Sequence, residues 1–518
     1  MGILLTEHAA ERGDEPALID ERGETTWAEL DRRVNQLVHA LRDAGLGLGD
    51  VVAIVAGNRR EWYELSLACG HAGITYVPVN WHWAVDELAY VFEDSGTRAV
   101  FCGHRFVEPV VAALADQRAA GVELFVTIGA AAEGATEYEE FVASGSPDEP
   151  DNQLLGGPMF YTSGTTGRPK GVRGSLSGGV DVPAEVLKLV AAGFDDFIPP
   201  GGRTLLCGPI YHSAQWAFSL LPMLNGSSVV MQHKFDQAEA LALIDSHRVS
   251  QVHLVPTQFK RFLDLPEELR AGFDGSSLEV VWHGAAPCPP EVKRQMIEWW
   301  GPVISEYYGS TEGAVISTVS SGEWLERGGS VGKPLPIVEV MVLDDEGAPV
   351  AAGAEGTLYF RNQMGSDFEY HNDPDKTAEA HLEPGVFTTG DIGYLDTDGY
   401  LWLSDRKIDM IISGGVNIYP AEIEGVVHSH PAVADVAVFG IPDDEFGEAV
   451  KAAVVLRDGL LPSDDLVAEI LAHCRDHLAN YKTPRSIDWA DELPRTGTGK
   501  IQKRTLREPY WAGTERRI

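Results

Sequence analysis

The stretch YTSGTTGRPKG, residues 161–171, combines three glycines, five hydroxyl side chains, an arginine and a lysine in eleven positions. Glycine lets backbone N–H groups approach an oxyanion closely, while hydroxyls and basic side chains add donors and charge. The stretch therefore predicts a loop that holds a polyphosphate. It is not a Walker loop, because Arg168 and Pro169 separate Gly167 from Lys170.

Helix and strand patterns alternate on both sides of this loop. Residues 26–46 have the apolar spacing of a helix and residues 50–58 form a β-branched run, and the same succession recurs at 107–120 and 122–130. Further buried strands are predicted within 203–212, 227–232, 249–259 and 278–287, with helices at 235–248 and 290–300. These patterns predict an α/β fold with mixed or largely parallel sheets flanked by helices.

The sequence changes character at about residue 330. Short runs at 338–350 and 355–362 predict a small antiparallel β subdomain that closes the large domain. Residues 396–420 end in a proline that suits the first turn of a helix over 421–430. We predict a large N-terminal domain over 1–405 and a small, mobile α+β C-terminal domain over 406–518.

Composition excludes several classes of protein. The 518 residues are 44% hydrophobic and 23% charged, as in ordinary globular proteins, and the net charge of −38 argues against binding nucleic acid. Five scattered cysteines without a CxxC pair indicate neither a disulfide framework nor a zinc site. We expect a cytoplasmic protein without a transmembrane segment or secretory signal, and a homodimer is compatible with the sequence.

Four further stretches accompany the phosphate loop: YYGSTEG (307–313), TTGDIGYLD (388–396), SDRKIDMIISGGVNIYPAEIE (404–424) and PRTGTGKIQK (494–503). In order and spacing, the five together resemble the AMP-forming adenylating superfamily of acyl-CoA synthetases, amino-acid adenylation domains and beetle luciferases. The resemblance covers essentially the whole chain and is nearest to acyl-CoA ligases. It implies that a carboxylate attacks the α-phosphorus of ATP, which requires in-line positioning and charge neutralisation.

The resemblance also implies roles for individual residues. Glu312 would hold Mg²⁺, Asp391 would accept from the ribose hydroxyls, and Lys500 would contact the substrate carboxylate and the α-phosphate, so that the catalytic residues are Lys500, Glu312 and Thr311. The remaining nucleotide-binding residues would be Ser163, Gly164, Thr165, Thr166, Gly167 and Lys170 of the loop, Gly284, Ala285, Ala286, Tyr307, Tyr308 and Gly309 around adenine, and Arg406.

Members of the resembled family reach thiol attack on the acyl-adenylate by rotating the C-terminal domain about a pivot just after the residue that matches Arg406. The rotation would withdraw Lys500 and bring Gly414 and Gly415 against a pantetheine tunnel, where a side chain would obstruct. One residue departs from the pattern. Ile408 stands at the pivot, where many relatives carry Asp or Lys, and its branched side chain is stiffer.

The sequence narrows the class of carboxylic acid but does not identify the individual substrate. Amino-acid adenylation domains usually place an Asp early in the substrate segment to pair with the α-ammonium, whereas PIYHSAQW (209–216) has His212. Amino acids are therefore disfavoured. The pocket candidates are aromatic or small, which suits an apolar fatty, aryl or steroid side-chain acid: Tyr211, His212, Trp216, Trp282, His283, Gly284 and Tyr307.

The leading hypothesis is an ATP-dependent, AMP-forming carboxylic acid–CoA ligase that uses ATP, Mg²⁺ and coenzyme A. An alternative keeps the adenylation but passes the acyl group to a separate carrier protein or another nucleophile. No attachment-serine motif follows Lys500, so free coenzyme A is the default acceptor. A non-enzymatic adenylate-binding relic is a third hypothesis, against which Glu312, Asp391, Arg406 and Lys500 together count.

Overall fold

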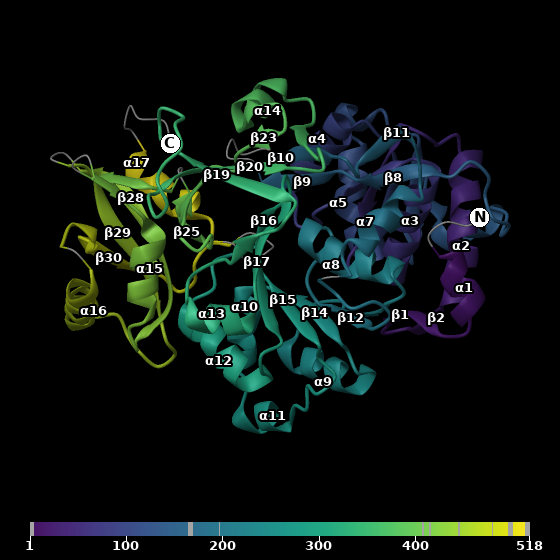
Figure 1. Cartoon of the computed structure of the whole chain (residues 1–518). Helices are drawn as coiled ribbons and strands as arrows, with labels where there is room; N and C mark the ends of the chain where they lie inside the picture. The colour runs from purple at the N-terminus through teal and green to yellow at the C-terminus, as the bar shows by residue number, and fades with distance from the viewer. Residues whose placement is uncertain are drawn as a thin grey trace.

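The computed structural model describes residues 5–163, 169–195, 197–406, 409–413, 416–443, 446–478, 480–495 and 501–512. The chain runs from two large sheets with their helices, through a small antiparallel sheet, to a separate C-terminal sheet (Figure 1). The predicted α/β fold class, with a small antiparallel subdomain and an α+β C-terminal region, is confirmed.

The first large sheet has seven strands and is parallel except at its β11 edge. Its central strand, Val51–Val55, is buried along its whole length, as expected for a parallel strand covered on both faces. In spatial order the strands are β11 (Gly178–Pro183), β8 (Leu154–Pro158), β4 (Thr75–Pro78), β3 (Val51–Val55), β5 (Thr97–Gly103), β6 (Leu124–Ile128) and β7 (Thr136–Glu137).

The second large sheet has nine strands, with parallel pairing in the centre and antiparallel pairing at both edges. Two of its strands, β16 and β17, lie in the middle of the molecule (Figure 1). In spatial order they are β18 (Lys333–Pro334), β17 (Ala314–Val319), β16 (Ile304–Ser310), β15 (Val280–His283), β14 (Gln251–Leu254), β12 (Arg203–Leu206), β13 (Ser228–Met231), β1 (Pro16–Asp20) and β2 (Gly23–Thr26).

Two smaller antiparallel sheets accompany the large ones. A three-stranded antiparallel sheet contains β21 (Phe368–Tyr370), β10 (Pro169–Gly174) and β9 (Phe160–Ser163). A six-stranded antiparallel sheet contains β22 (His381–Glu383), β23 (Val386–Phe387), β20 (Gly356–Asn362), β24 (Asp391–Leu395) and β25 (Leu401–Arg406), with β19 (Val338–Leu343) paired to β20.

The C-terminal sheet has its own buried cluster of aliphatic side chains. Its strands are β27 (Val416–Ile418), β26 (Ile411–Ser413), β29 (Gly447–Leu456) and β28 (Val433–Asp443), with β30 (Ser486–Trp489) parallel to β29. Arg406 still pairs with Asp391 in the preceding six-stranded sheet, and β26 begins at Ile411. The boundary between residues 405 and 406 stays a prediction.

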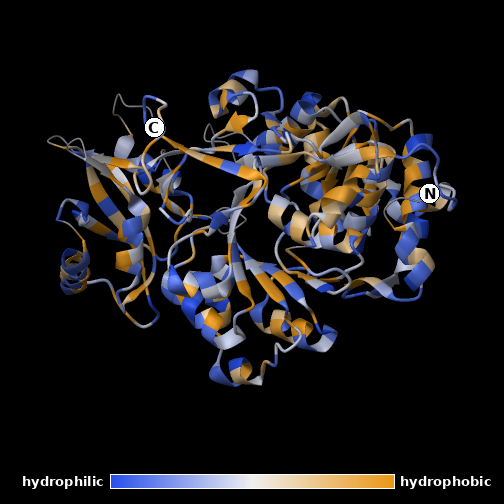
Figure 2. Cartoon of the chain, in the orientation of Figure 1, coloured by the Kyte–Doolittle hydropathy of each residue, from blue (hydrophilic) through white to orange (hydrophobic). Residues whose placement is uncertain are grey.

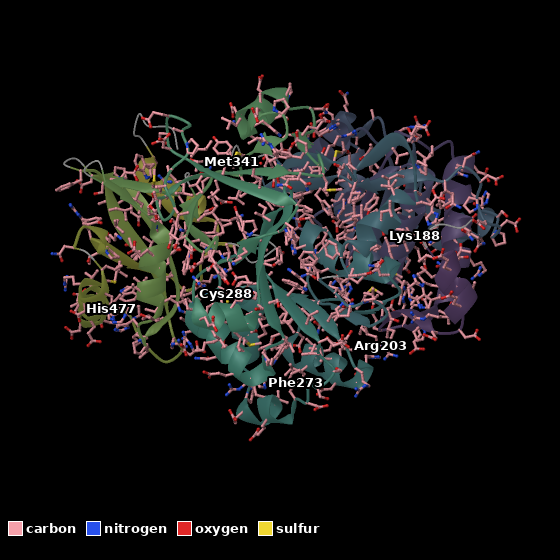
Figure 3. The ribbon with its side chains drawn as sticks, in the orientation of Figure 1. Lys188, Arg203, Phe273, Cys288, Met341 and His477 are labelled. Carbon is pink, nitrogen blue, oxygen red and sulfur yellow. The ribbon has the colours of Figure 1, made fainter. Side chains whose placement is uncertain are left out.

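Helices cover the sheets, and hydrophobic residues concentrate along the strands and the inward helix faces (Figure 2). Side chains fill the space between these layers (Figure 3). The α-helices are α1 (Thr6–Arg12), α2 (Trp27–Asp43), α3 (Arg60–Ala72), α4 (Val85–Ser95), α5 (Val107–Leu114), α6 (Tyr138–Ser144), α7 (Val186–Ala192), α8 (Ser213–Leu224), α9 (Gln237–His247), α10 (Pro256–Leu263), α11 (Glu267–Gly272), α12 (Pro290–Trp300), α13 (Ser321–Glu326), α14 (Pro374–Ala380), α15 (Pro420–His428), α16 (Asp464–His477) and α17 (Lys503–Trp511). Short 3₁₀ turns occupy His104–Phe106, Gln117–Ala119 and Asn480–Lys482.

The range predicted for a strand at 249–259 extends too far toward the C-terminus. It ends at Leu254, and Pro256 begins α10 two residues later. Proline lacks the N–H that a central strand needs but suits the first helical turn, so it marks the strand-to-helix junction. The strand predicted within 203–212 likewise ends at Leu206.

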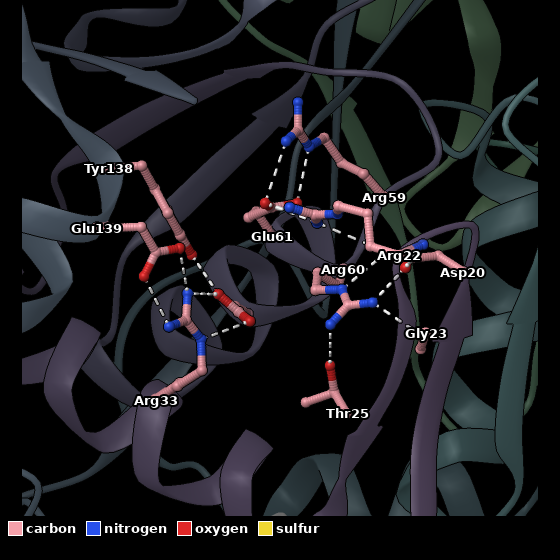
Figure 4. Close-up of polar contacts among 11 residues, drawn as sticks. Asp20, Arg22, Gly23, Thr25, Arg33, Arg59, Arg60, Glu61, Tyr138 and Glu139 are labelled. Atoms are coloured by element: carbon pink, nitrogen blue, oxygen red, sulfur yellow. Dashed lines mark hydrogen bonds and ion pairs between the residues drawn. The ribbon is translucent and has the colours of Figure 1, made fainter. Parts of the chain in front are cut away.

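A partly buried ion-pair network connects three helices of the first large sheet (Figure 4). Arg33 of α2 forms two hydrogen bonds to the carboxylate of Glu64 on α3, at 2.8 and 2.9 Å, and two to Glu139 of α6, both at 2.9 Å. The Tyr138 hydroxyl donates to Glu64 at 2.7 Å. Glu64 is fully buried, and burial raises its pKa even though Arg33 and Tyr138 oppose that rise.

Among the described residues, no helix combines the length and the apolar character that crossing a bilayer demands. All five cysteines carry free thiols.

Candidate active site

Strand β16 places two tyrosines on opposite sides of the same backbone. Neighbouring side chains on a strand point to opposite faces. The hydroxyl of Tyr308 donates to Asp391 Oδ2 at 2.5 Å, whereas Tyr307 belongs to an apolar cluster with Phe218 and Trp282. One strand therefore borders both a polar and an apolar site.

Asp391 begins β24 and is only 7% exposed. Its Oδ2 accepts from the Thr389 hydroxyl at 2.7 Å as well as from Tyr308, and in the β24–β25 pair it lies opposite Arg406. Both of these partners of the carboxylate are hydroxyl donors, the kind of group that a ribose also offers. The arrangement suits a group that binds vicinal hydroxyls.

Tyr370 contacts both a cation and a carboxylate. Lys170 Nζ lies 5.4 Å from the ring centroid of Tyr370, whose hydroxyl donates to Glu312 Oε1 at 3.1 Å. Lys170 is also 3.9 Å from the carboxylate of Asp373, and burial lowers the pKa of its amine, which Asp373 partly offsets. These residues can hold an anionic group together with a divalent cation.

The predicted phosphate loop connects two antiparallel strands. Ser163 on β9 pairs with Pro169 on β10, and Thr162 pairs with Lys170. Gly164, Thr165, Thr166, Gly167 and Arg168 lie outside the described residues. The flanking strands therefore bring Lys170 to the base of this loop.

Thr311 connects the YYGSTEG stretch to α8. Its hydroxyl lies 3.0 Å from the hydroxyl of Ser213, the first residue of that helix. The amino end of a helix carries unpaired N–H groups and a partial positive charge. Thr311 therefore lies where a negatively charged reacting group would be stabilised.

Small residues are required where β16 closely approaches the end of β15 on one side and β17 on the other. A Cβ added to Gly284 would lie 2.6 Å from a ring carbon of Tyr307, and one added to Gly309 would lie 2.0 Å from the carbonyl oxygen of Ala314. Ala285 has a φ of 66°, which is uncommon for a residue with a Cβ. Backbone strain of this kind is common at binding sites. The next residue, Ala286, is also predicted to bind the nucleotide.

The apolar cluster beside β16 contains two of the predicted pocket residues. Trp282 and Tyr307 contact Phe218 at centroid distances of 5.9 and 5.1 Å. The indole N–H of Trp282 donates to the carbonyl of Phe197 at 2.9 Å. This cluster is the best candidate for the acyl site among the described residues.

The other pocket candidates lie in different surroundings. Tyr211 packs edge-on against Trp81 at 4.5 Å and against His212. Trp216 donates its indole N–H to the hydroxyl of Tyr76 at 2.7 Å, within the main core cluster, where it borders a cavity of about 10 Å³.

His283 is fully buried behind the site, 3.6 Å from the carboxylate of Glu306, which accepts from Lys293 at 2.5 Å. Burial holds the pKa of His283 well below its usual value, so it is neutral at pH 7.

Sequence reasoning missed Tyr370, Asp373, Thr389, Phe197 and Phe218. The first two come from the stretch EYHNDPDK (369–376), which carries no motif. Phe218 had a signal, because it lies four residues after Ala214 on one face of α8, and both pack in the cluster with Trp282.

The sequence profile described as AMP-binding enzyme matches residues 5–366, and that of the AMP-binding enzyme C-terminal domain matches residues 422–500. The chain belongs to the AMP-binding enzyme family. The predicted resemblance to the AMP-forming adenylating superfamily is thus confirmed.

Relatives within the AMP-binding enzymes include CoA ligases. The chain is 35% identical to a feruloyl-CoA synthase of Amycolatopsis sp. over 94% of both chains. It is 32% identical to a fatty acid–[acyl-carrier-protein] ligase of Streptomyces coeruleorubidus over 99% of this chain and 96% of the relative. The chain also resembles the crystal structure of the anthranilate CoA ligase AuaEII in complex with anthranoyl-AMP. The TM-score is 0.87, at 25% identity over 98% of this chain and 96% of that chain.

Several residues predicted for an AMP-binding enzyme fall outside the described part of the chain. These are the loop residues named above, the pivot Ile408, Gly414, Gly415 and the catalytic candidate Lys500. The backbone of Ser163 and Arg406 is described through their strand pairing. The roles of all these residues stay predictions.

Replacing Asp391 with alanine removes the buried acceptor that Tyr308 and Thr389 hold in place. A lost hydrogen bond to a charged group costs about 1.5–3 kcal/mol, so ATP affinity should fall by roughly one to two decades. Isothermal titration with ATP measures this change. Thr389→Val is the control that keeps the carboxylate and should show a smaller loss, and an unchanged affinity in Asp391→Ala would place Asp391 outside the nucleotide site.

Proposed function

We propose that this chain is an ATP-dependent, AMP-forming ligase that converts an apolar carboxylic acid into an acyl-adenylate and then into an acyl-CoA thioester. The observation that carries the proposal is that β16 presents different side chains on its two faces. Tyr308 faces the acceptor Asp391, Tyr307 faces an apolar cluster, and Thr311 and Glu312 follow directly. An acid and a nucleotide bound on the two sides would meet at Thr311.

The donor set near Glu312 fits Mg²⁺ bound with ATP. Mg²⁺ usually takes one or two carboxylates and completes its octahedron with phosphate oxygens and water. Glu312 is half-buried, and Lys170, which contacts the same Tyr370, suits the phosphates. The described residues contain no group of three His, Cys, Asp or Glu side chains that would bind a metal alone. Glu312 would therefore hold the ion only together with the nucleotide.

Replacing Glu312 with glutamine keeps the shape of the side chain but removes its negative charge. We expect lower activity and a Mg²⁺ requirement raised by roughly tenfold, because one charge-assisted ligand is lost. Titrating Mg²⁺ at saturating ATP measures the shift. Asp373→Asn, which removes a nearby carboxylate, is the comparison variant, and a Mg²⁺ dependence in Glu312→Gln equal to that of the wild type contradicts the assignment.

The proposed second step uses the C-terminal domain, taken as residues 406–518. Rotation about Ile408 would exchange Lys500 for Gly414 and Gly415 at the site. Lys260 of α10 donates a hydrogen bond to the carbonyl of Ala434 at the start of β28, which links the large domain to the C-terminal domain in the arrangement described here. This bond would have to break for the domain to rotate.

The cytoplasmic location also stays a prediction.

The acceptor is tested by its product. A panel of fatty, aryl and steroid side-chain acids is incubated with ATP and Mg²⁺, and AMP and acyl-CoA are measured with and without coenzyme A. The proposal requires equal amounts of AMP and acyl-CoA for at least one acid. AMP and acyl-carrier formation only with a carrier protein would favour the second candidate, which the carrier-protein ligase among the relatives supports.

A further inference from the structure

Behind the apolar cluster, a hydrogen-bond chain runs from α8 through β14 to β16. Gln215 Nε2 lies 2.8 Å from His253 Nδ1, and His253 Nε2 lies 3.1 Å from the hydroxyl oxygen of Tyr307. The three residues are 4%, 2% and 7% exposed, so water does not compete for these contacts. This hydrogen-bond chain ends on the side chain of Tyr307, which borders the candidate acyl site.

The direction of this chain follows from one backbone oxygen. The amide atom of Gln215 that faces His253 Nδ1 also lies 3.4 Å from the carbonyl oxygen of His253. A carbonyl oxygen only accepts, so the facing atom is the amide nitrogen, and Nδ1 of the imidazole accepts from it. Burial lowers the pKa of His253 to about 3, so the ring is neutral and its single proton is on Nε2.

The hydroxyl hydrogen of Tyr307 is then left to be donated elsewhere. Nε2–H of His253 donates to the hydroxyl oxygen, and burial raises the pKa of Tyr307, so the phenol keeps its proton at neutral pH. In the described ranges of the chain, His253 is the only hydrogen-bond partner of this hydroxyl. The indole N–H of the neighbouring Trp282 is already used by the Phe197 carbonyl.

A buried hydroxyl donor in apolar surroundings is unfavourable unless an acceptor reaches it. Phe218 packs against Tyr307, Trp282 belongs to the same cluster, and Phe197 packs against Trp282. Such walls suit an aryl ring, and the donor suits an oxygen carried by that ring.

We propose that Tyr307 selects an aryl acid whose ring carries a hydrogen-bond acceptor, such as a hydroxyl or ether oxygen. Gln215 and His253 act as positioning residues that turn the tyrosine hydrogen toward the substrate. This inference rests on the proposed acid activation and names its substrate class. A plain hydrocarbon acid would fill the apolar walls but leave the donor unpaired.

Matched acids of nearly equal size test the inference. The 4-methoxy and 4-ethyl derivatives of benzoate, phenylacetate and cinnamate differ chiefly in the ether oxygen, and kcat/KM is measured for each by CoA-dependent AMP formation. The wild type should prefer the methoxy acid of its best pair by roughly tenfold or more. In Tyr307→Phe this ratio should fall to about one, and using a ratio cancels any general loss of activity in the variant.

The positioning role has its own measurement. His253→Leu should lower the methoxy-to-ethyl ratio, and His253→Gln, whose amide can still donate to Tyr307, should restore part of it. Tyr63→Phe is the matched control, because Tyr63 is a buried tyrosine that donates to Ser219 in the core, and its ratio should equal that of the wild type.

The outcomes separate the two levels of the proposal. No AMP from any acid would overturn the proposed function and the selectivity with it. AMP formation with a methoxy-to-ethyl ratio near one in the wild type, or a ratio that Tyr307→Phe leaves unchanged, would overturn the selectivity alone. Turnover of fatty acids without turnover of any aryl acid would also overturn it.

Discussion

Lys500→Ala is expected to lose acid-dependent pyrophosphate exchange by about 10²–10³-fold, because in the proposed mechanism it removes a charge that stabilises the transition state. The same variant should still convert a supplied acyl-adenylate into acyl-CoA, since Lys500 serves only the first half-reaction in the proposed rotation. Pyrophosphate exchange and thioester formation are measured separately. Lys482→Ala, which alters another lysine of the C-terminal domain, should keep both activities.

Gly415→Leu is the counterpart of this variant and should keep pyrophosphate exchange but fail with coenzyme A. A branched side chain would narrow the proposed tunnel without touching ATP. Gly425→Leu is a suitable control, because a Cβ at this helical glycine meets no atom within 4 Å. If Lys500→Ala and Gly415→Leu lose the same half-reaction to the same extent, while melting curves show both folded, the rotating-domain mechanism is contradicted.

Arg33→Met is expected to lower the free energy of unfolding by about 3–5 kcal/mol, because it leaves the fully buried Glu64 without its cation. Tyr138 is too weak a partner to compensate, since it offers one hydroxyl where Arg33 offers two N–H donors to Glu64. Urea titration of each variant measures the loss. A change below about 1 kcal/mol would contradict the assignment.

The pH dependence of Arg33→Met gives an independent check. Burial already raises the pKa of Glu64, and removing Arg33 raises it further. The folded state then binds the proton more tightly than the unfolded chain, whose Glu pKa is about 4.3. The deficit should therefore be smallest at and below that pH, grow as the pH rises toward the raised folded pKa of the variant, and level off above it.

Two further variants interpret the Arg33 result. Arg33→Met combined with Glu64→Leu removes both charges and should recover most of the loss, because an apolar pair of similar volume can replace a buried ion pair. Arg294→Met removes an arginine whose partner Glu291 is largely exposed, and it should change stability little.

Local patterns predicted the large sheets well, because β-branched runs and 3.6-residue spacing report burial directly. The helix predicted at 290–300 coincides with α12, and the strand within 50–58 contains β3. The error at Pro256 has a local cause, since a short apolar run does not distinguish the end of a strand from the start of a buried helix.

The candidate site was less predictable, because it depends on pairs that are distant in the chain. The motif that contains Asp391 was recognised, but its bond to Tyr308 crosses 83 positions, and the Tyr370–Glu312 bond crosses 58. Trp216 shows the same limit. Its type and position favour a pocket, whereas only the packing of α8 places it against Tyr76 and Phe218 against Tyr307.

The adjacency of Tyr307 and Tyr308 has a consequence for anyone who redesigns the acid preference. A substitution at position 307 that shifts the backbone of β16 would also displace Tyr308 and its contact with Asp391, so libraries built there would trade acid scope against affinity at the proposed nucleotide site. Phe218 lies on α8, a separate element from β16, and borders the same aromatic walls. Diversity placed at Phe218 would reshape the proposed acid site while leaving the proposed ATP site as a constant background for selection.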